Sequence, residues 1–289
     1  MEPLRTGPYP FVPIIRRPKL LWPHQARVAL WVIPNIESFA LNEQIHPGSQ
    51  KVPDVFAFSI REYGNRVGVW RLMEVLEKHR IRGTVALNSE VCLDYPQIVE
   101  AAMKLNWEFM GHNESNTRRL NELPEGTEAG VIHNTLETIR KKTGKKPVGW
   151  LSSGLQETWQ TLDFLKQEGV RYVADWVNDD QPYMMHTDGG EMVSIPYSSE
   201  INDKPAFETF HRSAEEFEGM IRKQFDVLYR EGADSGRVMA IALHPYIIGV
   251  PHRIDALSSA LDYICGHQGV WLATGQEIVN EYVRQCDPS

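Results

Sequence analysis

The chain has 289 residues, 42% of them hydrophobic, which is enough to bury the core of one large α/β domain. Its formal net charge of −8 argues against nucleic-acid binding, because phosphate contacts need a clustered basic surface. No apolar stretch approaches the length of about 18 residues that spans a membrane, and residues 1–19 lack an apolar signal region. We therefore expect a cytoplasmic protein with no nucleic-acid or membrane partner.

The N-terminal segment differs from the rest of the chain. Six prolines stand among the first 26 residues, and apolar residues show little periodicity there. We expect residues 1–26 to form an extended arm over the surface of a single domain, residues 27–289.

From residue 27 onward, apolar runs typical of buried strands alternate with stretches of helical spacing. The first run, "RVALWVI" at 27–33, is typical of a strand buried on both faces. The later expected strands are 81–87, 107–112, 148–151, 170–176, 191–197, 237–245 and 269–274. The expected helices are 65–79, 94–105, 124–143, 156–169, 213–232, 253–267 and 275–285. Seven or eight such units favour a closed parallel barrel over a doubly wound sheet, and no glycine-rich dinucleotide turn opens the first helix.

In a β/α barrel, the active site forms where the strands end, so polar residues just after strands are the candidates. We expect catalytic roles for Glu37, His112, Asp175 and His244, which follow four of the expected strands. Together they supply a base for water, a group that polarises a carbonyl and an acid for a departing nitrogen. Substrate contacts are expected from Asn35, Asn88, Asn116, Trp150, Trp176, Tyr197 and Asn202.

Each candidate also has a purely structural interpretation. A single histidine at a strand end is often bonded to loop backbone, and Glu37 alone could be a solvated loop carboxylate. Only the joint placement of the four residues favours a catalytic site. Three scattered cysteines and the absence of HExxH, paired CxxC and GxSxG patterns argue against a thiolate metal cage, a zinc protease and a serine hydrolase.

Several segments together resemble the polysaccharide deacetylase (NodB-like) superfamily, within it the branch of the cofactor-independent allantoinase and cyclic imide hydrolases. The matching stretches are "WPHQARVALWVIPNIE", "REYGNRVGVWRL", "GHNESNT", "GKKPVGW", "GVRYVADWVNDDQPY", "IPYSSEIND" and "ALHPYIIGVPHRIDAL", which run in the family's order. The resemblance implies a distorted (β/α) barrel of about seven parallel strands and hydrolysis of a C–N bond.

The resemblance also implies roles for individual residues. Metal-dependent members bind their ion through an aspartate and two histidines; here Glu37 stands in the place of the acid and His112 is the first histidine. Asn116 takes the place of the second histidine, which weakens any metal site because a neutral amide oxygen is a poor zinc ligand. Asp175 resembles the acid that orients the late histidine, His244. We therefore expect no cofactor; the alternative is a weakly bound divalent metal such as zinc on Glu37, His112 and Asn116.

The expected reaction is the opening of a small cyclic imide or ureide ring by water. Glu37 and His112 would position and deprotonate the water, Asn116 with Asn88 would hold the oxyanion, and His244 would protonate the leaving nitrogen. Metal-dependent de-N-acetylation of N-acetylated sugars is the alternative reaction, and a non-catalytic binding protein is an alternative of another class. By analogy with the branch, we expect a homo-oligomer.

Overall fold

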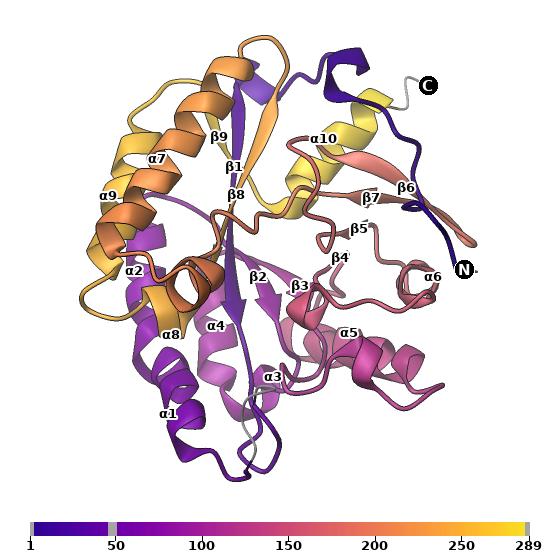
Figure 1. The fold of residues 1–289 in the computed structure, drawn as a ribbon, viewed down its shortest axis with the longest axis vertical. Coiled ribbons are helices and arrows are strands. Elements are labelled where there is room, and N and C mark those ends of the chain that lie inside the picture. Colours follow the sequence, from indigo (N-terminus) through magenta and orange to yellow (C-terminus); the bar gives the residue numbers. More distant parts are fainter. Residues whose placement is uncertain (1–2, 46–50, 287–289) are drawn as a thin grey trace.

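The computed structural model describes residues 3–45 and 51–286, so residues 1–2 of the expected arm and residues 46–50 and 287–289 of the expected domain lie outside the described part. In this part, one nine-stranded sheet has the order β6-β7-β5-β4-β3-β2-β1-β8, with β9 also paired to β1 (Figure 1). The strands are β1 (Val28–Ile36), β2 (Thr84–Leu87), β3 (Glu108–Gly111), β4 (Gly149–Trp150), β5 (Tyr172–Val173), β6 (Tyr183–Thr187), β7 (Gly190–Ser194), β8 (Arg237–Leu243) and β9 (Val270–Leu272).

Helices surround the curled sheet. In the view of Figure 1, α2, α7 and α9 lie to the left of β1, and α5, α6 and α10 lie to its right. The α-helices are α1 (Val55–Tyr63), α2 (Val69–Lys78), α3 (Val91–Asp94), α4 (Pro96–Lys104), α5 (Glu128–Thr143), α6 (Thr161–Gln167), α7 (Ala214–Glu231), α8 (Pro245–Ile248), α9 (Ile254–Cys265) and α10 (Gly275–Cys286). A capping box of Ser213 and Glu216 begins α7, and Gly144 ends α5 in the left-handed conformation. None of the described helices has the length and apolarity that a bilayer crossing requires.

The central strand, β1, is buried along its whole length. Its alternate residues belong to two different apolar clusters: Val28, Leu30 and Val32 to one, Ala29, Trp31 and Ile33 to the other. It pairs with β8 over seven residues and with β2 only through its last two, Asn35 and Ile36. The expectation of a strand buried on both faces is therefore confirmed, and β1 places the residue that follows it, Glu37, at the edge of the sheet where the parallel strands end.

The sheet is curled and mostly parallel, which confirms the expected distorted barrel in outline. Its last strand, β8, is bridged on its outer edge by two loops: Val238 N–H donates to Asp180 O at 2.9 Å, and Ala242 N–H to Ile201 O at 3.0 Å. These bonds replace a regular strand pairing between the two ends of the sheet.

One part of the expected topology is wrong. The structure contains a strand, β6, that the sequence did not predict, and β6 runs antiparallel to β7. The two strands are joined by the two-residue turn Asp188–Gly189, a sequence that favours tight hairpins. No helix separates β5 from this hairpin, so the regular β/α alternation is interrupted there and resumes with α7 and β8.

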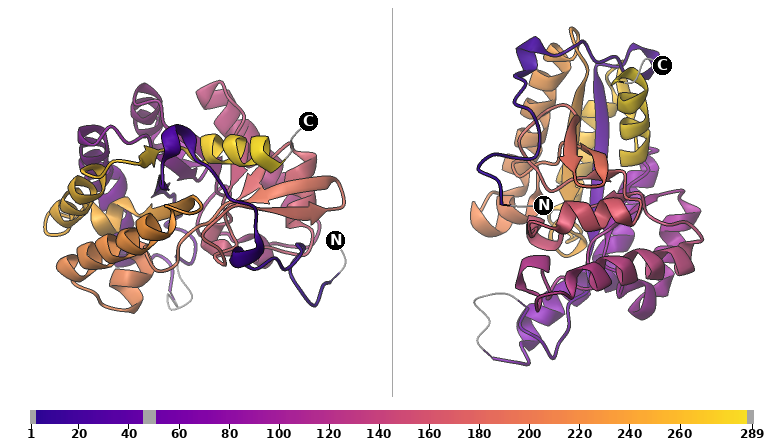
Figure 2. Two further views of the ribbon diagram at one scale, coloured as in Figure 1. Left: turned by 90° about the horizontal axis from the view of Figure 1, so that it is seen from above. Right: turned by 90° about the vertical axis from the view of Figure 1, so that its right-hand side faces the viewer.

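The arm lies across the hairpin and the adjoining loop (Figure 2). His186 N–H donates to Pro8 O at 2.7 Å, and the Arg17 guanidinium donates to both carboxylate oxygens of Asp179 at 2.7 and 2.5 Å. Asp179 also accepts the N–H groups of Asp180 and Gln181, and Gln181 donates to Gly236 O. The "NDDQPY" segment therefore holds the arm and the open side of the sheet together.

Candidate active site

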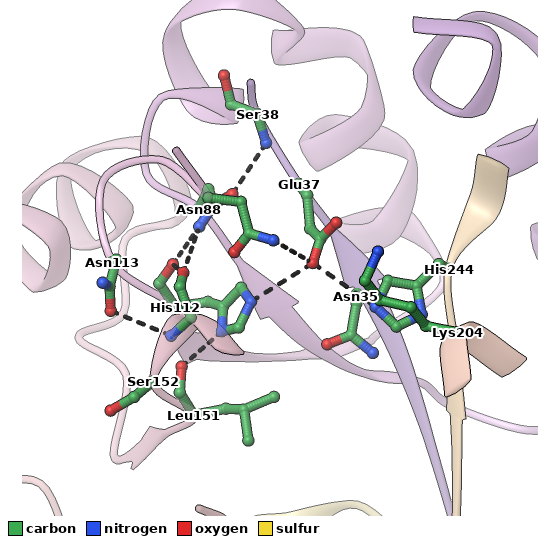
Figure 3. A network of polar contacts seen from close by, with 12 residues as sticks. Asn35, Glu37, Ser38, Asn88, His112, Asn113, Leu151, Ser152, Lys204 and His244 are labelled. Carbon is green, nitrogen blue, oxygen red and sulfur yellow. Dashed lines mark hydrogen bonds and ion pairs between the residues drawn. The ribbon is translucent and has the colours of Figure 1, made fainter. Parts of the chain in front are cut away.

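Polar residues that follow different strands meet at one edge of the sheet, because parallel strands end on the same side. Glu37 directly follows β1, His112 follows β3 and His244 follows β8. Each of the three side chains is no more than 6% exposed. Figure 3 shows Glu37 between the two imidazoles. The structure thus brings together three of the four expected catalytic residues.

Glu37 is the centre of this group. Its Oε1 accepts a hydrogen bond from Asn116 Nδ2 at 2.7 Å and lies 3.7 Å from His112 Nε2 and 3.6 Å from His244 Nε2. The last two distances exceed a direct hydrogen bond and fall in the range that a bridging oxygen can span. Its other oxygen, Oε2, is buried and has no hydrogen-bond partner among the described residues.

The charges of the group are strongly coupled. Burial alone would raise the pKa of Glu37, but the charge of His244, the contacts with both imidazoles and the charge of Lys204 hold it well below its usual range. Burial would likewise lower the pKa of His244, but the charges of Asp203 and Glu37 raise it to about 9. At neutral pH the site therefore holds an ionised carboxylate facing an imidazolium.

Asp203, not Asp175, orients His244. Asp203 is completely buried; its Oδ1 lies 2.6 Å from His244 Nδ1, and its Oδ2 accepts the His244 backbone N–H at 2.7 Å. The expected role of Asp175 is therefore wrong. The signal for Asp203 was its place at the end of "IPYSSEIND", but the loop reaches β8 only through the bridge between Asn202 and Ala242, which spacing does not reveal.

We expect Asp203→Asn to move the basic limb of the pH–rate profile. An acid must carry its proton to donate it, so activity that depends on His244 is present below its pKa and lost above it. Without the charge of Asp203, the pKa of His244 falls from about 9, and activity is lost at a lower pH. The check is kcat/KM against pH; a basic limb at the same pH in both proteins would contradict the role of Asp203.

Asp175 lies instead on the other side of the site, behind His112. Its Oδ1 accepts the backbone N–H of Ser152 at 2.7 Å, and His112 Nδ1 lies 2.5 Å from Leu151 O. A carbonyl only accepts, so Nδ1 carries a proton and Nε2 is the nitrogen that faces Glu37. This is the orientation in which His112 can accept a proton from a group beside Glu37.

Asn88 and Asn35, two residues that were expected to contact the substrate, form hydrogen bonds within the protein. Asn88 accepts the Ser38 N–H at 2.9 Å and donates to His112 O, so its amide ties the ends of three strands together. Asn35 donates to Ile33 O at 3.2 Å and shares a hydrogen bond with the Tyr197 hydroxyl. The oxyanion role expected of Asn88 is not supported, because its polar atoms are already used.

Other residues that were expected to contact the substrate also form hydrogen bonds or pack within the protein. Trp150 is fully buried in an apolar cluster and donates to Ser152 Oγ, so it does not face a ligand. Trp176 is half-buried, donates to Glu157 and packs edge-on against Tyr9 of the arm. Asn202 accepts the Lys204 N–H at 3.0 Å and so shapes the loop that presents Asp203. Among the expected contacts, Asn116 bonds directly to a side chain of the central group of Glu37, His112 and His244, that of Glu37.

The donor atoms do not fit a three-ligand catalytic metal site. Glu37 and His112 could each supply one good ligand, but Asn116 turns its N–H group toward the same carboxylate oxygen. The His244 imidazolium, 3.6 Å from that oxygen, would also oppose a dication. Among the described residues, no three His, Cys, Asp or Glu side chains form a metal-binding group. As arranged, Glu37, His112 and Asn116 therefore offer a metal two good ligands instead of three.

Comparisons with known proteins agree with this fold. No protein-family model matches the chain. The putative polysaccharide deacetylase of Schizosaccharomyces pombe is 26% identical over 296 aligned positions, covering 90% of this chain and 92% of that protein. The structure of a probable polysaccharide deacetylase from Pseudomonas aeruginosa PAO1 is 27% identical with a TM-score of 0.85, over 93% and 95% of the two chains. PuuE allantoinase is 25% identical with a TM-score of 0.84, over 94% and 95%.

The fold, the grouped acid and imidazoles and these relatives support one class of protein, a hydrolase of C–N bonds. These relatives support the polysaccharide deacetylase (NodB-like) superfamily that the motifs indicated. The structural neighbours of the chain include proteins named as deacetylases and one named as an allantoinase, so superfamily membership alone does not select the substrate.

Proposed function

We propose that the protein opens the ring of a small cyclic amide, an imide or ureide, by metal-independent attack of water. The observation that carries this proposal is the 2.7 Å hydrogen bond from Asn116 Nδ2 to Glu37 Oε1. It places a neutral amide where a metal-dependent site would need a ligand, and it leaves the carboxylate to act on water instead.

The proposed reaction uses the two imidazoles in opposite roles. A water held by Glu37 Oε1 gives a proton to His112 Nε2 as its oxygen bonds to the ring carbonyl carbon. The C–N bond then breaks, and the ring nitrogen takes the proton of His244 Nε2. The low pKa of Glu37 makes it a weak base, so His112 is the better acceptor and Glu37 the group that orients water and stabilises the imidazolium.

The polar atoms of the site favour a substrate with N–H groups. Glu37 Oε2 and Asn116 Oδ1 are both buried acceptors without a hydrogen-bond partner among the described residues. Buried polar atoms are normally paired, so a ligand that donates to both would satisfy the site. Imides and ureides carry such N–H donors on a small ring, and the neighbour PuuE is named as an allantoinase.

De-N-acetylation is the second candidate, because the relatives from S. pombe and P. aeruginosa are named as deacetylases. An N-acetyl sugar also carries an amide N–H. A non-catalytic binding role is less compatible with a carboxylate and an imidazolium that are buried face to face, because such an arrangement costs desolvation energy.

A substrate panel separates the three functions. Purified protein is incubated with allantoin, hydantoin, succinimide, maleimide and N-acetylglucosamine oligomers, and ring-opened products and acetate are quantified. The proposal predicts ring opening of at least one cyclic amide and no acetate release. Acetate release without ring opening would overturn it in favour of the deacetylase, and no product from any substrate would favour a binding protein.

A further inference from the structure

One peptide group connects His112 to Asp175. The carbonyl of Leu151 lies 2.5 Å from His112 Nδ1, and the N–H of the same peptide group, on Ser152, donates to Asp175 Oδ1 at 2.7 Å. Figure 3 shows Leu151 and Ser152 beside the ring of His112. His112, Ser152 and Asp175 are all buried, so the connection is shielded from solvent.

A peptide group that is hydrogen-bonded at both ends transmits the effect of a charge at one end to the hydrogen bond at the other. The C–N bond of a peptide group has partial double-bond character, so electron density shifts between its nitrogen and its oxygen. An anion that accepts from the N–H increases the negative charge on the carbonyl oxygen, and hydrogen bonds in series strengthen one another. A charged Asp175 therefore makes Leu151 O a stronger acceptor for the Nδ1 proton of His112.

We propose that Asp175 is a positioning residue for His112, which it holds in the Nδ1–H form through the Leu151–Ser152 peptide group. The Nε2 lone pair then faces Glu37, where the proposed reaction needs a proton acceptor. This inference rests on the proposed function for the role of His112, but not for the hydrogen bonds themselves. It also gives Asp175 a role different from the one that the resemblance implied.

Glu157 lies next to Asp175 and keeps this carboxylate charged. Burial raises the pKa of both carboxyl groups. The pKa of Glu157 rises well above its usual range, whereas contacts with Glu157 and Ser152 limit the rise at Asp175, so Glu157 is the protonated member of the pair. Its Oε1 accepts the Trp176 indole N–H at 3.2 Å, which leaves the other oxygen to carry the proton. A neutral donor beside Asp175 relieves the cost of burying its charge.

The test compares Asp175→Asn with the wild type by NMR of ¹⁵N-labelled histidine rings, without substrate. The His112 signals are assigned from their loss in His112→Gln. The asparagine oxygen can still accept the Ser152 N–H, but the charge is gone. We expect the His112 Nδ1–H proton resonance to move upfield, and kcat on a turned-over cyclic amide to fall about tenfold, with KM little changed.

Three controls make the result decisive. Asp163 is a second buried aspartate that accepts a backbone N–H, that of Asp188 at 2.8 Å, and Asp163→Asn should leave the His112 signals unchanged. Glu157→Gln should also leave them unchanged, because glutamine keeps a neutral group of the same size beside Asp175. If Asp175→Asn does not fold, the wild-type spectrum alone still tests the tautomer.

Unchanged His112 signals in Asp175→Asn, or an Nε2–H form of His112 in the wild type, would overturn the inference. The NMR readout needs no substrate, so it is independent of the proposed reaction. The expected spectra together with no turnover of any cyclic amide would reject the proposed function alone.

Discussion

Glu37→Gln is expected to lower turnover at least about 100-fold, the usual scale for a group that takes part directly in acid–base chemistry. The glutamine keeps the size of the side chain but removes the charge that faces both imidazoles at 3.6 and 3.7 Å. Without that charge the site binds the reacting water more weakly. The pKa of His244 also falls, because one of the two anions that raise it is gone. The measurement is kcat on the best substrate of the panel.

Glu90→Gln is the matched control for this change. Glu90 follows β2 at the same edge of the sheet, but it pairs with Arg118 and contacts neither imidazole. Its replacement should leave turnover within about twofold, since surface changes away from special features have small effects. A folded Glu37→Gln protein with near wild-type turnover would show that Glu37 is not part of the reaction.

His244→Ala has the second largest expected effect, also about 100-fold or more in kcat. This change removes the proton donor for the leaving nitrogen and leaves Asp203 as a buried carboxylate without its imidazolium partner. Substrates whose leaving nitrogen is a weaker base need less help from an acid. We therefore expect the loss to be smaller for imides than for hydantoins.

The chain offers a second histidine–aspartate pair as the control. His79 is also buried, with Nδ1 2.7 Å from Val75 O and Nε2 3.0 Å from Asp262, but it lies at the end of α2, outside the central group. His79→Ala should reduce stability and leave kcat unchanged. Equal losses of kcat in both variants would point to a general effect on folding instead of a lost acid.

The sequence predicted the three residues at the centre of the site because the ends of strands can be recognised from apolar runs. Glu37, His112 and His244 each end such a run, and a parallel sheet brings those ends together whatever the loops do. Strand β6 was missed because it is short and partly exposed, although Asp188–Gly189 was a usable turn signal between it and the predicted strand β7.

The remaining errors concern where single side chains point. Asp175 and Asp203 both follow strands of the same region, and only the bridge between Asn202 and Ala242 brings Asp203 against His244. Trp150 is the last residue of β4, and its side chain packs into the core instead of facing the site. Periodicity over a two-residue strand is too short to assign faces, so the sequence could not separate these cases.

In the proposed reaction, Glu37 and His112 activate water without a metal. The most direct test is the ring-opening rate of protein that has been dialysed against a chelator, with metal content per chain measured by mass spectrometry. We expect the same kcat before and after chelation, and the chelated protein should contain far less than one metal ion per chain. A rate that falls with chelation and returns when zinc or cobalt is added would contradict this expectation.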